Sequence, residues 1–145
     1  MKKVILYTQE HSKILPLDKE TTGNYKNYDA ISRAVVKLAE QIDADLIVAA
    51  TKSGATAEAI ASQRPNIPML SVTSNPRVAG QLALAYANSA IVRPYDVDYA
   101  INAALDLKGT GYLKVPEGKD SLTVVLVSGL RDEEGGTNQI QIRKI

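Results

Sequence analysis

The chain has 145 residues, a formal net charge of +1 and an apolar share of 45%, which suit one compact domain with one core. The balanced charge gives no electrostatic reason to expect nucleic acid or an anionic membrane as a partner. The sequence has no cysteine, which excludes disulfides, thiolate metal sites and cysteine nucleophiles and fits a cytoplasmic protein. No apolar run is long enough to cross a bilayer.

The N-terminal part of the chain is predicted to be a short strand followed by an extended connection. The weak alternation from Lys3 to Tyr7 indicates a strand. Residues 8–27 are polar and rich in Lys, Thr, Asn and Gly, and connections of this length are often functional or mobile. We therefore separate an N-terminal segment, residues 1–24, from a domain that spans residues 25–145.

Helices and strands alternate through that domain. Four strands are predicted, at 45–50, 67–72, 90–92 and 122–128. The first is apolar without alternation, as expected of a strand that is buried on both faces, and the last is the strongest strand signal in the chain. Helices are predicted between and before these strands, at 29–41, 55–62, 76–88 and 97–107. A last segment, 139–144, alternates polar and apolar residues and is typical of an edge strand with one wet face. This order predicts an α/β fold with a parallel sheet covered on both sides by right-handed crossovers.

Caps and apolar faces are predicted for the individual helices from residue spacing. Asn75 followed by Pro76 is a helix start with proline in the first helical position. Asp96 is expected to cap the helix that begins at Val97. The residues expected to be buried are Ile31, Ala34, Val35 and Leu38 in helix 29–41, Val78, Leu82 and Tyr86 in helix 76–88, and Val97, Ile101, Ala104 and Leu105 in helix 97–107.

The best local candidate for a binding site is the loop from Thr51 to Thr56, which has the sequence Thr-Lys-Ser-Gly-Ala-Thr. It follows a buried strand and opens a helix, where free backbone N–H groups and the helix dipole favour an anion. Ligands of open α/β sheets bind beyond the carboxyl ends of the strands, where this loop lies. The alternative is that Ser53 or the threonines only cap the helix, that Gly54 only permits a tight turn, and that Lys52 is solvated.

A second candidate is the charged loop after the strongest strand, residues 129–138, in which Arg131 could hold a phosphate or carboxylate. The acidic run Asp132–Glu134 would repel an anion, and it lacks the ligand spacing of a calcium loop. His11 is the only histidine, and neither a nucleophile elbow nor a clear general base is present. These features predict no catalytic residues, no metal and no cofactor.

Several of these stretches resemble, in order and spacing, the C-terminal domain of pyruvate kinase. They are 29–50, the Thr51–Thr56 loop, Arg64-Pro65-Asn66-Ile67-Pro68, Ser71-Val72-Thr73-Ser74, 78–84 and the ending with Gly136-Thr137-Asn138. The resemblance implies a three-layer α/β/α sandwich with a mostly parallel five-stranded sheet and an antiparallel last strand. It also implies that a Thr-x-Ser-Gly-x-Ser/Thr loop, here Thr51, Lys52, Ser53, Gly54, Ala55 and Thr56, holds a phosphate of an allosteric effector such as a sugar phosphate or nucleotide.

The chain departs from the family at the second effector phosphate. An arginine that some members use there corresponds to Ala100, and Arg93 is a candidate replacement near a family tryptophan. The glycine-rich closing loop is acidic here, although Gly136 is kept. A monophosphate therefore fits better than a sugar bisphosphate.

Three functions follow from the sequence and the resemblance. The first is a non-catalytic module, without the catalytic barrel, that binds a phosphorylated small molecule. The second is an interaction or oligomerisation protein, either a homodimer or a separately encoded partner of a truncated pyruvate kinase. The resemblance implies a subunit interface, and the exposed strand 139–144 is a candidate for edge pairing. The third is an enzyme in which Lys52 and Arg131 stabilise anionic charge.

Overall fold

The computed structural model describes residues 2–11, 27–96, 98–129 and 137–145. These residues form five helices and five strands, which are, in chain order, α1 (Lys2–His11), α2 (Asn27–Gln41), β1 (Leu46–Ala50), α3 (Ala55–Ser62), β2 (Met69–Thr73), α4 (Pro76–Leu82), β3 (Asn88–Val92), α5 (Tyr99–Gly109), β4 (Thr123–Gly129) and β5 (Thr137–Lys144).

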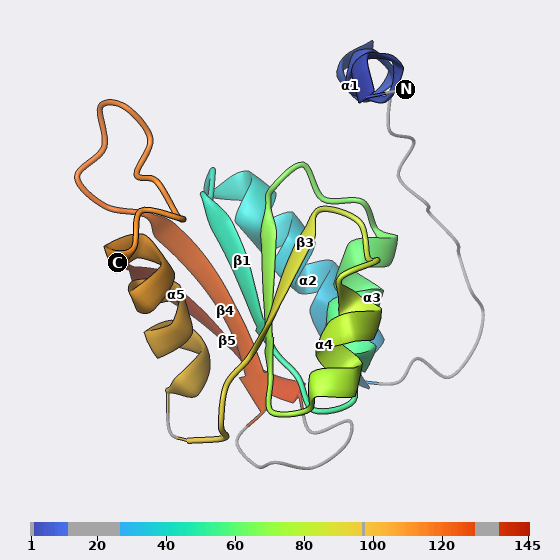
Figure 1. Cartoon of the computed structure of the whole chain (residues 1–145), viewed down its shortest axis with the longest axis vertical. Helices are drawn as coiled ribbons and strands as arrows, with labels where there is room; N and C mark the ends of the chain where they lie inside the picture. The colour runs from blue at the N-terminus through green and yellow to red at the C-terminus, as the bar shows by residue number, and fades with distance from the viewer. Residues whose placement is uncertain (1, 12–26, 97, 130–136) are drawn as a thin grey trace.

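The strands form one five-stranded sheet in the order β3-β2-β1-β4-β5. β1 is parallel to β2 and β4, and β2 is parallel to β3, whereas β5 is antiparallel to β4. Helices α2, α3 and α4 cover one side of the sheet and α5 covers the other (Figure 1). The predicted three-layer α/β/α fold with an antiparallel last strand is therefore confirmed.

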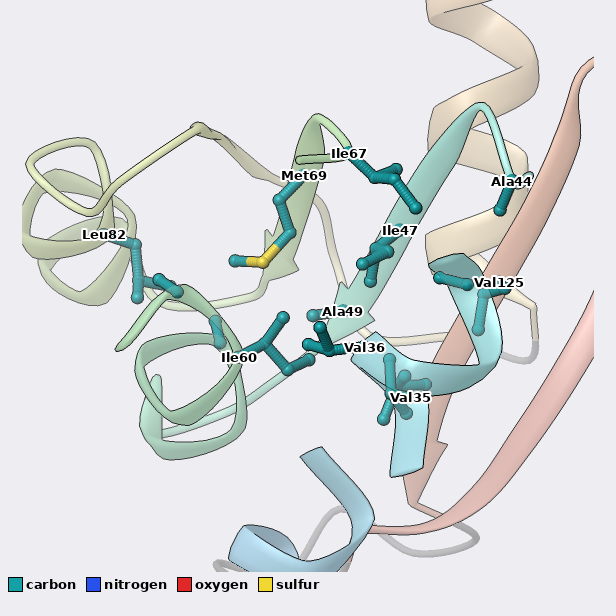
Figure 2. Close-up of a cluster of buried hydrophobic side chains, with 14 of the residues drawn as sticks. Val35, Val36, Ala44, Ile47, Ala49, Ile60, Ile67, Met69, Leu82 and Val125 are labelled. Carbon is teal, nitrogen blue, oxygen red and sulfur yellow. The ribbon is translucent and has the colours of Figure 1, made fainter. Parts of the chain in front are cut away.

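β1 lies at the centre of the sheet, and all five of its residues are buried. Ile47 and Ala49 belong to the apolar cluster beneath α2, α3 and α4, which Figure 2 shows. Leu46, Val48 and Ala50 belong to the cluster beneath α5. Successive side chains of a strand point to opposite faces, so a strand covered on both faces has no polar alternation, as predicted.

The N-terminal strand prediction is wrong, because Lys2–His11 is the helix α1. Both long edges of the sheet are formed by other strands, β3 and β5, and an isolated strand leaves its backbone groups without partners. A helix satisfies most of these groups within itself. Tyr7 and His11 also stack one turn apart, with ring centroids 4.0 Å from each other.

Helix α4 ends at Leu82, six residues before the predicted end. The side chain of Asn88 donates to the Leu82 carbonyl oxygen at 2.8 Å and accepts from the hydroxyl of buried Ser71 at 2.7 Å. These contacts bind β3 to β2 and to the end of α4, and Ala87 turns the chain with a φ of 53°. Tyr86, predicted to be buried, is half-buried beside the guanidinium group of Arg64.

Helix α5 begins at Tyr99 instead of Val97, and Val97 lies outside the described residues. The residue at the N-cap position is Asp98, which has a φ of 60° and makes no side-chain cap hydrogen bond, so the cap predicted at Asp96 is wrong. Two expected core residues are exposed: Leu105 of α5, at 44%, and Ala34 of α2.

The start of α4 agrees with the sequence, since Asn75 accepts a hydrogen bond from the Arg77 N–H at 3.0 Å and Pro76 opens the helix. Within the part of the chain that the structure describes, no helix is long and apolar enough to span a membrane.

Candidate functional site

The predicted loop lies at the middle of the carboxyl edge of the sheet. It follows β1, which is flanked by β2 and β4, and it leads directly into α3. The backbone N–H of Thr51 donates to the carbonyl oxygen of Val72 in β2 at 3.0 Å. The loop therefore starts from a position that the neighbouring strand fixes.

A buried threonine gives this loop its shape. Thr51 is 6% exposed, and its hydroxyl oxygen accepts a hydrogen bond from the backbone N–H of Gly54 at 3.0 Å. This bond closes the turn on its buried side, whereas Lys52 and Ser53, between the two bonded residues, are exposed. Thr51 therefore supports the turn, and Ser53 and Lys52 are the side chains that the turn presents to solvent.

The prediction that Ser53 or a threonine caps α3 is wrong. Gly54 occupies the N-cap position, and no side-chain cap hydrogen bond is made there. The first intrahelical bond runs from the N–H of Glu58 to the carbonyl oxygen of Gly54 at 2.9 Å. The N–H groups of a first helical turn have no acceptor within their own helix, and Gly54 at the N-cap has no side chain that could accept from them.

The remaining predicted residues of the loop are less accessible than Ser53. Ala55 is half-buried and Thr56 is 4% exposed. Thr56 lies on the buried side of α3 with Ala57 and Ile60, so its hydroxyl group is covered by the fold.

Gly54 is required by both its conformation and its surroundings. Its φ of 92° lies in the left-handed region, which favours glycine. A β-carbon built on Gly54 would lie 3.3 Å from Cγ1 of Val78 and 3.5 Å from Cδ2 of Leu82. The start of α3 therefore packs directly against α4.

A cation beside this contact, Arg77, was not among the site residues predicted from the sequence. Arg77 precedes Val78 in the first turn of α4 and is exposed. Its position just after the proline that opens a helix, beyond the carboxyl end of β2, is the signal that could have identified it.

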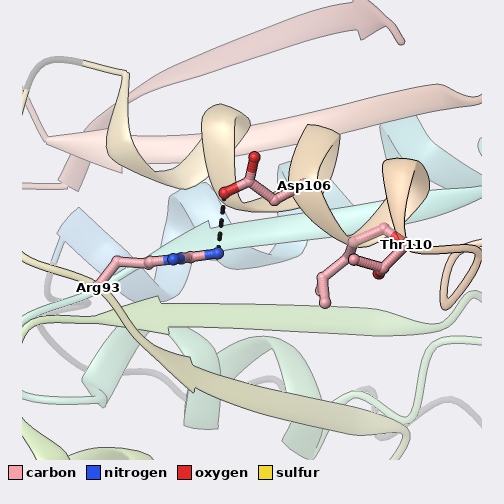
Figure 3. A network of polar contacts seen from close by, with 4 residues as sticks. Arg93, Asp106 and Thr110 are labelled. Atoms are coloured by element: carbon pink, nitrogen blue, oxygen red, sulfur yellow. Dashed lines mark hydrogen bonds and ion pairs between the residues drawn. The ribbon is translucent and has the colours of Figure 1, made fainter.

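Arg93 does not join the loop. Its guanidinium group donates to the carboxylate of Asp106 on α5 at 2.9 Å (Figure 3). Because α5 covers the opposite side of the sheet from α3, this ion pair holds Arg93 on the other face. The two side chains are 42% and 63% exposed, so the pair is a surface contact.

The other predicted site residues, Arg131 and Gly136, lie outside the described residues, as does the acidic run 132–134. Their predicted roles stay predictions. Among the residues that the structure does describe, no three His, Asp or Glu side chains gather into a group that could hold a metal ion.

A charged hydrogen-bond pair lies at the other end of β1, before its first residue. Asp45, just before β1, is 9% exposed; it accepts from the Lys119 ammonium group at 2.5 Å and from the N–H of Thr123 at 2.8 Å. Partial burial works to raise the pKa of Asp45, but these hydrogen bonds and the lysine charge outweigh it and hold the pKa below its ordinary value. This contact joins the loop before β4 to the start of β1 and is structural.

The family model described as "Pyruvate kinase, alpha/beta domain" matches residues 29–143. The chain belongs to this family. The match begins in α2 and ends in β5, so this pyruvate kinase α/β domain includes every strand of the sheet. The expected resemblance is thereby confirmed.

The relatives of this pyruvate kinase domain are much longer proteins. It is 28% identical over 131 residues to the pyruvate kinase of Clostridium acetobutylicum, which covers 87% of the chain and 27% of that protein. The pyruvate kinase of Geobacillus stearothermophilus is 32% identical over 120 residues, or 81% of the chain and 20% of that protein. One from Agrobacterium vitis is 29% identical over 151 residues, covering 98% of the chain and 30% of that protein. The chain therefore spans less than a third of each of these relatives.

Proposed function

We propose that this pyruvate kinase α/β domain is a non-catalytic, regulatory module of the cytoplasm that binds a phosphorylated small molecule at the Thr51–Thr56 loop. The observation that carries the proposal is the geometry at Gly54. A left-handed glycine opens α3 without a side-chain cap, and the N–H groups of a first helical turn favour an anion.

The side chains around this turn are suited to one phosphate group. Ser53 can donate a hydroxyl hydrogen bond, and Lys52 supplies a positive charge in the same exposed turn. Arg77 adds a second cation on the helix against which Gly54 packs. The acceptor oxygens of a phosphate match such donors, and hydrogen bonds to a charged group are stronger than neutral ones.

A monophosphate fits these residues better than a bisphosphate. Arg93, the candidate for a second phosphate, is paired with Asp106 on the other face of the sheet. Ala100, where some relatives of the family have an arginine, is 3% exposed and belongs to the core under α5. We therefore expect a sugar monophosphate or a nucleoside monophosphate as the ligand class.

The test is a thermal-shift titration of the purified chain with inorganic phosphate, sugar mono- and bisphosphates, AMP and ATP. A ligand at 100 times its dissociation constant adds about 2.7 kcal/mol to the free energy of unfolding, a melting shift of several degrees in a domain of this size. We expect a monophosphate to give the largest shift.

Two matched pairs of variants locate the site. Ser53→Ala and Lys52→Gln should abolish or weaken the shift, since both remove exposed groups of the turn. Ser62→Ala, at the far end of α3, and Lys114→Gln remove exposed groups away from the loop and should leave it unchanged. No shift with any anion, or a shift that Ser53→Ala and Lys52→Gln leave intact, would overturn the proposal.

A further inference from the structure

Two tyrosine rings lie at the same end of the sheet as the Thr51–Thr56 loop. β3 ends at Val92, and the chain then crosses the carboxyl edge of the sheet to reach α5; Figure 1 shows this crossing and the loop at the same end. Tyr95 belongs to the crossing and Tyr99 is the first residue of α5. Their ring centroids are 5.4 Å apart, with the planes tilted by 52°.

Backbone hydrogen bonds fix the spacing between the crossing and the loop. The N–H of Thr51 donates to the carbonyl oxygen of Val72 in β2 at 3.0 Å, and the N–H of Arg93 donates to that of Thr73 in β2 at 2.9 Å. Thr51 and Arg93 therefore flank the end of β2 on its two sides. Since neighbouring strands lie about 4.8 Å apart, the loop and the crossing begin about 10 Å from each other. A nucleoside monophosphate is long enough to reach from one to the other.

The two rings differ in exposure. Tyr99 is half-buried and packs against the apolar cluster beneath α5. Tyr95 lies against Tyr99 and is 49% exposed. The core thus holds the inner ring, and the inner ring supports an outer ring that stays in contact with solvent. A supported, exposed aromatic ring of this kind is a surface on which a planar base stacks.

The charges near Tyr95 disfavour a second phosphate and favour an amino group. Asp96 and Asp98 are both exposed, and the closest cation along the chain, Arg93, is paired with Asp106. Carboxylates repel a phosphate, but they accept hydrogen bonds from the exocyclic amino group of a base such as adenine or cytosine. The crossing is therefore suited to an uncharged ring that carries a hydrogen-bond donor.

Asp98 is the carboxylate that we assign to this contact. It occupies the N-cap position of α5, yet it has a φ of 60° and makes no side-chain cap hydrogen bond. A capping side chain normally requires an extended backbone at this position. The left-handed backbone therefore leaves the carboxylate of Asp98 outside the helix and exposed, directly before Tyr99.

We propose that the ligand of the Thr51–Thr56 loop is a nucleoside monophosphate whose base carries an exocyclic amino group. The base stacks on Tyr95, and its amino group donates to Asp98. This inference rests on the proposed function, because it takes the phosphate to lie at the loop, and it decides between the two ligand classes named there. A sugar monophosphate has no planar ring to stack on Tyr95, whereas AMP contacts the loop, the ring and the carboxylate together.

Isothermal titration of the purified chain with four ligands tests this inference. The ligands are AMP, purine riboside 5′-monophosphate, which lacks only the amino group, ribose 5-phosphate, which lacks the base, and inorganic phosphate. We expect AMP to bind about 5- to 150-fold more tightly than ribose 5-phosphate, the range that one stacked base contributes. The purine riboside monophosphate should bind with an affinity between the two. Equal affinities for AMP and ribose 5-phosphate would overturn the inference and leave the phosphate site standing.

Variants of the tyrosine and the carboxylate give matched comparisons. Tyr95→Leu should weaken AMP by the same factor and leave ribose 5-phosphate unchanged, which also shows that the variant is folded. Tyr95→Phe keeps an aromatic ring and should retain AMP. Asp98→Gly removes the carboxylate, and glycine accepts a φ of 60°; it should abolish the preference for AMP over the purine riboside monophosphate. Tyr112→Leu, at a tyrosine that is 64% exposed beside Ser89, should change no affinity.

The loop variants separate the two proposals. Ser53→Ala and Lys52→Gln should weaken AMP and ribose 5-phosphate alike, because both ligands use the phosphate site. AMP binding that Tyr95→Leu leaves intact would overturn the base contact. AMP binding that needs Tyr95 but neither Ser53 nor Lys52 would place base and phosphate at separate sites and would also overturn it. Failure of all four ligands to bind would overturn both proposals.

Discussion

Replacing Gly54 with alanine tests the account of the loop most directly. The substitution leaves the charge and the surface of the loop unchanged, but it adds one methyl group to a residue with a φ of 92°. An L-residue in the left-handed region loses about 1–2 kcal/mol relative to a right-handed conformation. The new Cβ would also lie 3.3 Å from Val78 Cγ1, so α3 and α4 must separate slightly.

We therefore expect Gly54→Ala to lower the free energy of unfolding by about 1–3 kcal/mol, measured by urea denaturation. The melting temperature should fall by about 4 °C for each kcal/mol in a domain of this size. Because the start of α3 moves away from α4, the affinity for a monophosphate should also fall, and this loss should remain at temperatures where the variant is fully folded.

The matched control is Gly80→Ala, the same chemical change within α4. A Cβ on Gly80 would have no atom within 4 Å, and alanine favours a helix over glycine by about 0.5–1 kcal/mol. This variant should be as stable as the natural chain or more so. If both variants changed stability equally, or if Gly54→Ala were neutral, the assignment of Gly54 as a conformational requirement would be refuted.

Three further substitutions separate buried from exposed polar contacts. Asp45→Asn should cost roughly 1–2 kcal/mol at neutral pH, because it weakens a charged hydrogen-bond pair at a mostly buried carboxylate. The pKa of Asp45 is lowered on folding, so its contribution is present above the ordinary value of 3.8 and is lost as the pH falls through the lower folded value; urea titrations should show the two chains converging in acid. Asp106→Asn should change the free energy of unfolding by less than about 1 kcal/mol, because its ion pair with Arg93 is exposed. A larger loss in urea denaturation would contradict the assignment of this pair as a surface contact. Asn88→Ala should cost about 2–3 kcal/mol because it leaves the hydroxyl of Ser71, which is 0% exposed, without its acceptor; calorimetry that finds a neutral variant would refute this.

The strands and the central helices could be predicted because their signals are local. The run at β1 is apolar throughout, as burial on both faces requires, and the predicted helix at 55–62 has the observed bounds of α3. The antiparallel direction of β5 came from the family resemblance, whereas its role as an edge came from its alternation of polar and apolar residues.

The errors arose where distant contacts override local preference. Residues 83–87 are rich in alanine and favour a helix, but the amide of Asn88 ends α4 at Leu82 through contacts with β2 and the helix end. Residues 2–11 include a stretch suited to a strand, but the sheet that the described residues form has β3 and β5 at its edges and no place for it. Local sequence carries neither kind of information.

The predicted loop does lie between β1 and α3, but its internal structure could be predicted only in part, and its role as a binding site stays a prediction. The sequence indicated the turn and its glycine. It did not show that Thr51 supports the turn from within, since that requires knowing that the hydroxyl is buried. It also could not show that Asp106 pairs with Arg93, because that pairing depends on the side of the sheet on which α5 lies.

The position of β1 between β2 and β4 has a consequence for how the chain is made and folded. Asp45 contacts Lys119 and Thr123, which follow it by 74 and 78 residues, so β4 pairs with β1 only after most of the chain has been synthesised. Until then, a half-sheet of β1, β2 and β3 exposes one edge of the most apolar strand. We expect the pairing of β1 with β4 to be a late, slow step of folding, and the nascent chain to be most prone to aggregation just before β4 leaves the ribosome.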